Sequence, residues 1–125
     1  MLLLDANVIL RYLLADDPGM ADKAEEWIAS GVAHATMEVL AEVVYVLQKV
    51  YKTDRRDIAE AVSGVLRQLE CADKRVAETA LSVYADTALD FVDCVLCARH
   101  RVRGDEIATF DKPLLKYLSR PRPGT

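Results

Sequence analysis

Two aspartates in this chain each follow directly on a short apolar run, one near each end of the sequence. Asp5 follows Met1–Leu4, and Asp111 follows Ile107–Phe110. We predict that both runs are short strands, and a carboxylate at the mouth of a buried strand is costly unless something there needs it. In open α/β sheets, ligands bind at the carboxyl ends of the strands. The two aspartates therefore predict one acidic site that folding assembles from both ends of the chain.

The predicted helix over residues 37–51 offers two glutamates to such a site. Its apolar stripe has helical spacing and consists of Val39, Leu40, Val43, Leu47 and Val50. Because a helix advances ~100° per residue, Glu42 lies ~100° from the centre of the stripe and Glu38 ~140° away. Glu42 is therefore predicted at the rim, from which it reaches the site, whereas Glu38 points further into water. The simpler alternative for Glu42 is a solvated surface glutamate.

A second predicted helix, over residues 91–103, begins with two more acids. Asp90 is well placed to cap it, and we assign Asp90 mainly to capping, with a supporting role at a metal. Asp93 lies among apolar neighbours, from Phe91 to Cys97. An acid in so apolar a helix is rarely buried without a partner, and a metal ion would be such a partner.

Two uncharged side chains are candidates for polar support. Asn7 caps the first helix or supports Asp5, and Thr109 is predicted to point away from Phe110, which places its hydroxyl beside the acids. Asp111 can cap the last helix and still offer its second oxygen to a ligand. His34 and His100 are isolated in the sequence and are predicted to be packed or surface residues.

Three or four converging carboxylates repel one another and would be forced to hold protons unless a cation lay between them. Oxygen ligands of this kind favour Mg²⁺ or Mn²⁺, which keep positions open for water and for the oxygens of a phosphate. Such an ion can activate water and stabilise a leaving oxygen. The predicted chemistry is therefore hydrolysis of a phosphodiester.

Composition points to a single folded domain over residues 1–125. The chain is 52% hydrophobic, with no repeat, linker or apolar run near the ~20 residues that span a membrane. Its three cysteines include Cys94 and Cys97 in an apolar helical stretch, which suits buried thiols in a reducing cytoplasm. No second Cys or His pair has the spacing of a zinc site. We expect a cytoplasmic protein without a targeting segment.

Charge is distributed unevenly along the chain. Of 16 basic and 20 acidic residues, residues 99–125 hold seven and three, which leaves nine basic and 17 acidic residues elsewhere. The body is acidic and the C-terminal end basic. This end is a candidate edge for RNA phosphates, with Lys112, Lys116 and Arg120 as its clearest members; a solvated helix face explains it equally well.

Helices dominate the predicted elements, and the strands between them are very short. Strands are expected at 1–5, 32–35, 69–72 and 107–110. Helices are expected at 7–14, 18–30, 37–51, 54–69, 75–86, 91–103 and 111–118. Alternating strands and helices predict an α/β fold with a parallel sheet and helices on both faces.

Four motifs in order resemble the PIN-domain ribonucleases, most closely the VapC-type toxins of toxin–antitoxin pairs. They are Leu-Leu-Asp5-Ala-Asn7-Val-Ile-Leu-Arg11, Glu42-Val-Val-Tyr, Leu-Asp90-Phe-Val-Asp93 and Ala-Thr109-Phe-Asp111-Lys. The resemblance spans nearly the whole chain. One departure is Ala6, where the family usually has Thr or Ser, and we expect this to tune activity without removing a ligand.

The resemblance implies a three-layer α/β/α fold with a short-stranded central parallel sheet. It implies an endoribonuclease dependent on Mg²⁺ or Mn²⁺, a homodimer, and a cognate VapB-like antitoxin. The family's acids map onto Asp5, Glu42, Asp93 and Asp111, and its supporting polar positions onto Asn7 and Thr109. Candidate RNA contacts are Arg11, Lys112 and Lys116.

Two other functions remain open at this stage. Asp5 alone would permit an aspartyl-phosphate phosphotransferase or phosphoacceptor, in which it acts as the nucleophile. The long helices 37–51 and 54–69 would also suit a non-catalytic dimeric binding module, in which the acids cap helices or hold a structural ion.

Overall fold

The computed structural model describes residues 1–121, and the tail of residues 121–125, for which the sequence predicts irregular structure, lies outside them except for Pro121. Helices account for 65% of the structure, with a small parallel sheet. The strands are β1 (Leu2–Leu3) and β2 (Ala33–His34). The helices are α1 (Ala6–Leu14), α2 (Pro18–Ala29), α3 (Met37–Lys49), α4 (Arg55–Leu66), α5 (Lys74–Asp86), α6 (Phe91–Arg103) and α7 (Lys112–Leu118). The predicted fold class, α/β with short parallel strands and high helix content, is confirmed.

Helix starts follow the caps that the sequence indicates. Asp17 accepts a hydrogen bond from the Met20 amide at 3.1 Å, with Pro18 in the first turn of α2. Thr36 accepts one from the Val39 amide at 3.2 Å and begins α3. Such caps satisfy amides that have no partner within the helix.

The sheet is small because its parallel strands are only two residues long. β1 pairs with β2 in the register Leu2↔Ala33 and Leu3↔His34. A third stretch joins at a single point, where the Glu70 amide donates to the Ala33 carbonyl at 2.9 Å and the Ala35 amide donates to the Glu70 carbonyl at 3.0 Å. The strand expected at 69–72 is thus reduced to an isolated bridge.

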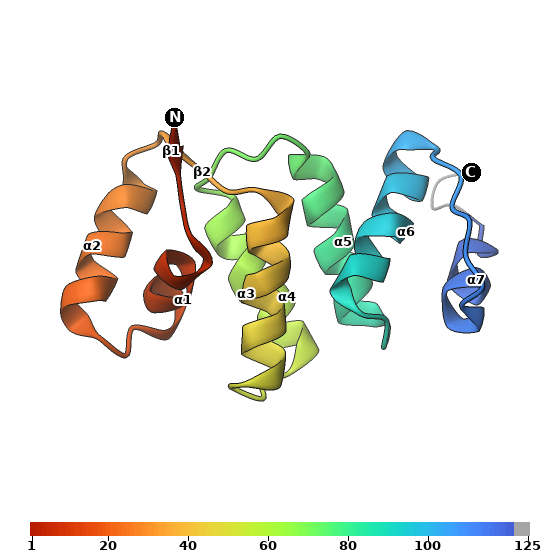
Figure 1. Cartoon of the computed structure of the whole chain (residues 1–125), viewed down its shortest axis with the longest axis horizontal. Helices are drawn as coiled ribbons and strands as arrows, with labels where there is room; N and C mark the ends of the chain where they lie inside the picture. The colour runs from red at the N-terminus through yellow and green to blue at the C-terminus, as the bar shows by residue number, and fades with distance from the viewer. Residues whose placement is uncertain (122–125) are drawn as a thin grey trace.

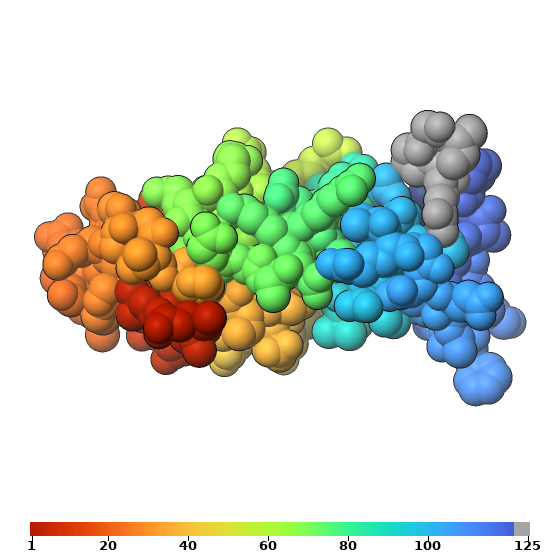
Figure 2. All heavy atoms as spheres, turned by 90° about the horizontal axis from the view of Figure 1, so that it is seen from above, coloured from red at the N-terminus to blue at the C-terminus, as the bar shows by residue number. Residues whose placement is uncertain are grey.

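The elements follow one another along the long axis of the molecule in nearly the order of the chain. Figure 1 shows α1 and α2 beside β1 at one end, α3 and α4 next, then α5 and α6, with α7 at the far end. The view from above shows the same progression of colours (Figure 2). The two ends of the chain are therefore held apart.

A continuous apolar core links these elements. It consists of the buried faces of the helices, with Ile9, Leu40, Val43, Ile58, Leu66, Leu81 and Tyr84 among its largest fully or almost fully buried side chains. At the C-terminal end, α7 is attached through Leu114, which is buried. The apolar stripe predicted for α3 is buried at Leu40, Val43 and Leu47, half-buried at Val39 and exposed at Val50.

Two predictions about local structure were wrong. Residues 107–110 form no strand, because no described strand lies beside them: β1 and β2 are towards the opposite end of the molecule (Figure 1). Asn7 does not cap the first helix. Asp5 takes that position, and its carboxylate accepts a hydrogen bond from the Asn7 amide at 3.3 Å.

Candidate active site

Asp5 lies where β1 gives way to α1, as predicted for a residue at a strand end. Its side chain is exposed, and its Oδ1 receives only the Asn7 amide among the described residues. This hydrogen bond satisfies one of the amides at the start of α1 that have no partner within the helix. Asn7 is also exposed and is the second residue of α1, in its first turn, where it can support Asp5.

Asp111 begins α7 in the same way that Asp5 begins α1. Its Oδ2 accepts from the Leu114 amide at 3.0 Å, so the predicted cap is confirmed. The Thr109 hydroxyl accepts from the Asp111 amide at 3.0 Å. This bond fixes the turn into α7, and it gives Thr109 a supporting role next to the acid.

Asp93 is the most perturbed of the acids. It lies half-buried in the first turn of α6, and burial raises the pKa of its carboxyl, with further increases from the charges of Asp111 and Asp90. Asp90 occupies the N-cap position of α6, but its carboxylate makes no capping hydrogen bond. Asp90 thus holds the N-cap position that the sequence predicts, without the side-chain hydrogen bond of a cap, and its carboxylate adds negative charge beside Asp93.

A cleft of about 320 Å³ lies next to these acids, between α3 and the start of α6. Asp90, Val92 and Asp93 line one side, and Tyr45 and Lys49 line the other. Burial also raises the pKa of the nearby Cys94 thiol to about 12 and of the Cys97 thiol to about 11. Both thiols therefore stay protonated at neutral pH.

Glu42 is exposed on α3, one turn before Tyr45, in keeping with its predicted place at the rim of the apolar stripe. Helix α3 packs against α1 on one side and α6 on the other. Glu42 thus lies on the helix between the element that carries Asp5 and the element that carries Asp93.

The five predicted acids do not form one cluster. The charges of Asp90 and Asp111 both act on Asp93, whereas Asp5 lies at the N-terminus of α1, towards the other end of the long axis, and Glu42 lies on α3 between them (Figure 1). Among residues 1–121, no three His, Cys, Asp or Glu side chains are close enough to hold a metal ion. The all-oxygen donor set and the mutual repulsion at Asp93 suit a hard divalent cation. One chain in this arrangement supplies only part of a coordination shell.

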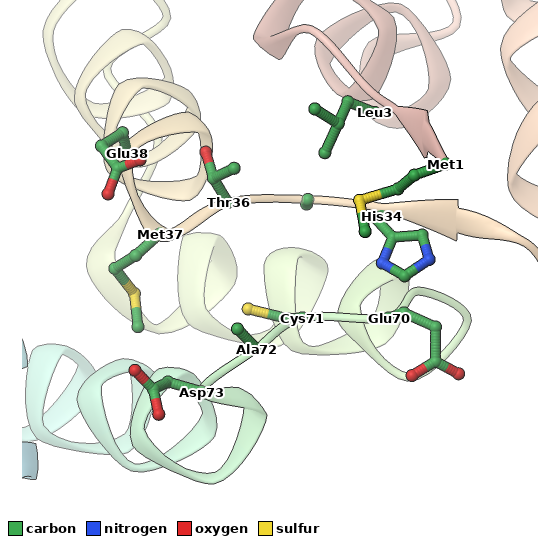
Figure 3. Close-up of a pocket in the computed structure, with 11 residues that line it drawn as sticks. Met1, Leu3, His34, Thr36, Met37, Glu38, Glu70, Cys71, Ala72 and Asp73 are labelled. Atoms are coloured by element: carbon green, nitrogen blue, oxygen red, sulfur yellow. The ribbon is translucent and has the colours of Figure 1, made fainter.

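A larger cleft, of about 530 Å³, lies elsewhere on the molecule (Figure 3). Met1, Leu3 and His34 line it along the strands, and Glu70 and Asp73 line its opposite edge. None of the predicted acids lines this cleft. Its volume alone therefore does not identify it as the site of chemistry.

Sequence reasoning missed Arg55, which holds the turn that presents Asp90. Its Nε donates to the Tyr84 carbonyl at 2.9 Å, its Nη2 donates to the Leu89 carbonyl at 2.5 Å, and its guanidinium lies 3.7 Å from the centre of the Tyr84 ring. These partners are 29 and 34 residues away in the chain, so no local pattern marks the contact. Tyr45 and Lys49 were missed for the same reason.

The predicted RNA-contacting cations differ in how they are engaged. The guanidinium of Arg11 pairs with Asp16 at 2.8 Å and donates to the Tyr51 hydroxyl at 3.3 Å. Lys112 and Lys116 are exposed, and neither forms an ion pair with another described residue. The two lysines are therefore better placed than Arg11 to meet a phosphate.

The fold and the acids at its helix starts define an α/β domain with carboxylates at strand and helix ends. The PIN domain family model matches residues 2–117. The chain therefore belongs to the PIN domain family. PIN domains are typically nucleases and generally use divalent metal ions. No curated protein and no solved structure matches the chain.

None of the helices within residues 1–121 is long and apolar enough to cross a membrane.

Proposed function

We propose that this protein is a Mg²⁺- or Mn²⁺-dependent endoribonuclease and acts as the toxin of a toxin–antitoxin pair. The observation that carries the proposal is Asp93, a half-buried carboxyl whose pKa is raised by burial and by Asp111 and Asp90 beside a cleft. Perturbed acids in a cleft mark functional sites more often than structural ones. Membership of the PIN family supports hydrolysis as the reaction.

The metal, when bound, would lower the pKa of a water molecule and stabilise charge on the phosphate oxygens. Asp93 and Asp111 would hold it, together with Asp5 and Glu42. Asp90 would add negative charge beside Asp93, and its carboxylate would accept a hydrogen bond from a water molecule in the cleft. Asn7 and Thr109 would hold Asp5 and Asp111 in place.

A basic surface next to α7 supports RNA as the substrate. Lys116 and Arg120 line a cleft of about 300 Å³ with Thr87 and Leu89, a few residues before Asp90. The Arg120 guanidinium lies 4.9 Å from the centre of the Tyr117 ring. Cations and an exposed aromatic edge suit the phosphates and bases of a single strand.

The test is cleavage of structured RNAs by purified protein with Mg²⁺, with Mn²⁺ and with chelator. We expect cleavage only with metal, and a loss of about 100-fold or more in Asp93→Asn. The matched control is Asp22→Asn, an equal charge change at an exposed position of α2. Metal-independent cleavage, or full activity of Asp93→Asn, would refute the proposal.

The toxin role has its own test. Expression of the protein in cells should stop growth, and co-expression of the neighbouring short open reading frame should relieve the arrest. If cells that express Asp93→Asn still stop growing, the toxicity does not depend on the proposed hydrolysis of RNA.

A further inference from the structure

The backbone of residues 106–110 is extended and has no partner. No backbone amide or carbonyl of these five residues forms a hydrogen bond with another described residue. Phe110 is fully exposed. Unpaired extended backbone that carries an exposed aromatic side chain is a template for pairing with another strand.

This segment is nonetheless held firmly at both ends. Before it, Arg99 donates to the Asp105 carboxylate at 2.7 Å, and the ring of His100 contacts the Asp105 carbonyl at 2.9 Å. After it, Leu114 anchors α7, and Arg101 donates to the Tyr117 hydroxyl at 2.9 Å. The segment is therefore presented as a preformed strand at the end of the molecule.

A matching edge lies at the opposite end. β1 pairs only with β2 among the described strands, which leaves its other edge open. Met1 and Leu3 are exposed along it, and they border the large cleft of Figure 3. Within one chain, α3 to α6 separate this edge from residues 106–110 (Figure 1).

Surface area and charge both point to a second copy as the partner. The chain exposes 7453 Å². A compact monomer of this mass would expose about 6,700 Å², so the chain exposes more surface than a compact fold of its size. The segment that follows residue 98 is basic and the remainder acidic, so two copies that lie side by side in opposite directions bring unlike charges together.

We propose that two copies of this chain complete each other's site, with residues 106–110 of one copy pairing in parallel with β1 of the other. The carboxyl ends of parallel strands meet at one edge, so Asp111 of one copy would lie beside Asp5 of its partner. Asp93 and Asp90 would arrive with Asp111. A two-fold axis makes the exchange reciprocal and yields two composite sites per dimer.

Pairing in this register also removes the exposed apolar surface. Side chains alternate along a strand, so Phe110 would share the face of Leu4, which is buried in the core, and Thr109 would share the face of Leu3. Phe110→Ser should therefore weaken the dimer by about tenfold or more without unfolding the chain. Met20→Ser, an exposed apolar position on α2, is the control, and both are compared by light scattering after size exclusion.

The decisive experiment uses two chains on a Cys71→Ser background, one with Leu3→Cys and the other with Thr109→Cys, so that the introduced thiol is the accessible one and Cys94 and Cys97 stay buried. Mixed under mild oxidation, the two chains should form a disulfide-linked dimer. A third chain carries both Leu3→Cys and Thr109→Cys. If the mixture stays unlinked while this double variant forms a disulfide within one chain, residues 106–110 pair with β1 of their own chain. No linkage in either sample would reject the pairing itself.

An activity test rests on the proposed function. Asp5→Asn and Asp93→Asn chains, each inactive, are unfolded together and refolded as a mixture. Half of randomly formed dimers are mixed and hold one intact site of two, so about a quarter of the wild-type activity should return. A mixture of Asp93→Asn and Asp111→Asn chains should regain no activity, because both residues belong to the same half of each composite site and every site then lacks one of them. If the refolded wild type is active but the Asp5→Asn and Asp93→Asn mixture recovers no activity, the exchange between copies is wrong. If the wild type itself is inactive, the proposed function is wrong, and the disulfide test still decides the exchange.

Discussion

The two ends of this molecule start helices with the same residue type in the same position, yet they do so in different surroundings. Asp5 follows a paired strand and lies alone, whereas Asp111 follows an unpaired segment and lies with Asp93 and Asp90. Neither end holds enough ligands for a metal ion among the described residues. This difference is the basis of our proposal that each end carries one part of an acidic site.

The largest expected effect of a single substitution is on RNA cleavage. Asp5→Asn should reduce cleavage by about 100-fold or more, as much as Asp93→Asn, because each removes a ligand of the same ion. Initial rates on one structured RNA at saturating Mn²⁺ check this. A normal rate for Asp5→Asn alone would mean that the C-terminal acids act without the N-terminal end.

Stability should depend strongly on Arg55, which ties α4 to the turn before Asp90. Arg55→Ala removes two hydrogen bonds to backbone carbonyls and the stacking of the guanidinium on the Tyr84 ring. We expect a loss of roughly 2–4 kcal/mol in the free energy of unfolding, measured by urea denaturation. Arg56→Ala is the control, because its exposed ion pair with Asp86 at 3.9 Å should contribute little. Equal losses in the two variants would contradict this role for Arg55.

Two helix starts at the C-terminal end can be compared directly. Asp111→Ala should cost about 1 kcal/mol in the free energy of unfolding, because it deletes the acceptor of the Leu114 amide. Asp90→Ala should cost less, because Asp90 makes no capping bond and adds repulsion at Asp93. If Asp90→Ala is the more destabilising, Asp90 serves the helix and not the site.

The raised pKa of Asp93 predicts how stability changes with pH. Below the ordinary value of 3.8, Asp93 is protonated in both the folded and unfolded states and has no effect. As the pH rises from there through the raised folded value, the unfolded state releases the proton more readily, so the folded state loses stability. Asp93→Asn should lack this loss.

The measurement is the unfolding midpoint of both proteins between pH 3 and pH 7 without metal, followed by addition of Mg²⁺. Stability of Asp93→Asn relative to the wild type should grow with pH, and Mg²⁺ should stabilise only the wild type. A difference that does not change with pH would remove Asp93 from the acidic cluster.

Much of the helical framework could be predicted from sequence, because its signals are local. Thr36 and Asp17 began helices where expected, and Asp111 both began α7 and capped it. Asp5 and Asp93 also occupy the positions at a strand end and in a crowded helix that suggested them. These features depend on neighbours within a few residues, which periodicity and capping rules describe.

The parts that could not be predicted depend on distant contacts. Residues 107–110 have the composition of a strand, but a strand also needs a neighbour, and β1 lies at the other end of the chain. Packing between helices far apart in sequence leaves the carboxylate of Asp90 without a capping hydrogen bond. The same packing brings Arg55 within hydrogen-bonding distance of the Leu89 carbonyl. Local patterns therefore predicted where each acid lies in its own element better than they predicted which acids lie close together.

Binding of Mn²⁺ to wild-type, Asp5→Asn and Asp93→Asn protein, measured by calorimetry without RNA, tests the central claim most directly. Asp5 and Asp93 lie on different helices, α1 and α6, and a composite site would place both around one ion. Both variants should therefore lose Mn²⁺ binding, while Asp22→Asn keeps it. Retention of wild-type affinity by Asp5→Asn, with loss only in Asp93→Asn, would contradict a site built from both ends.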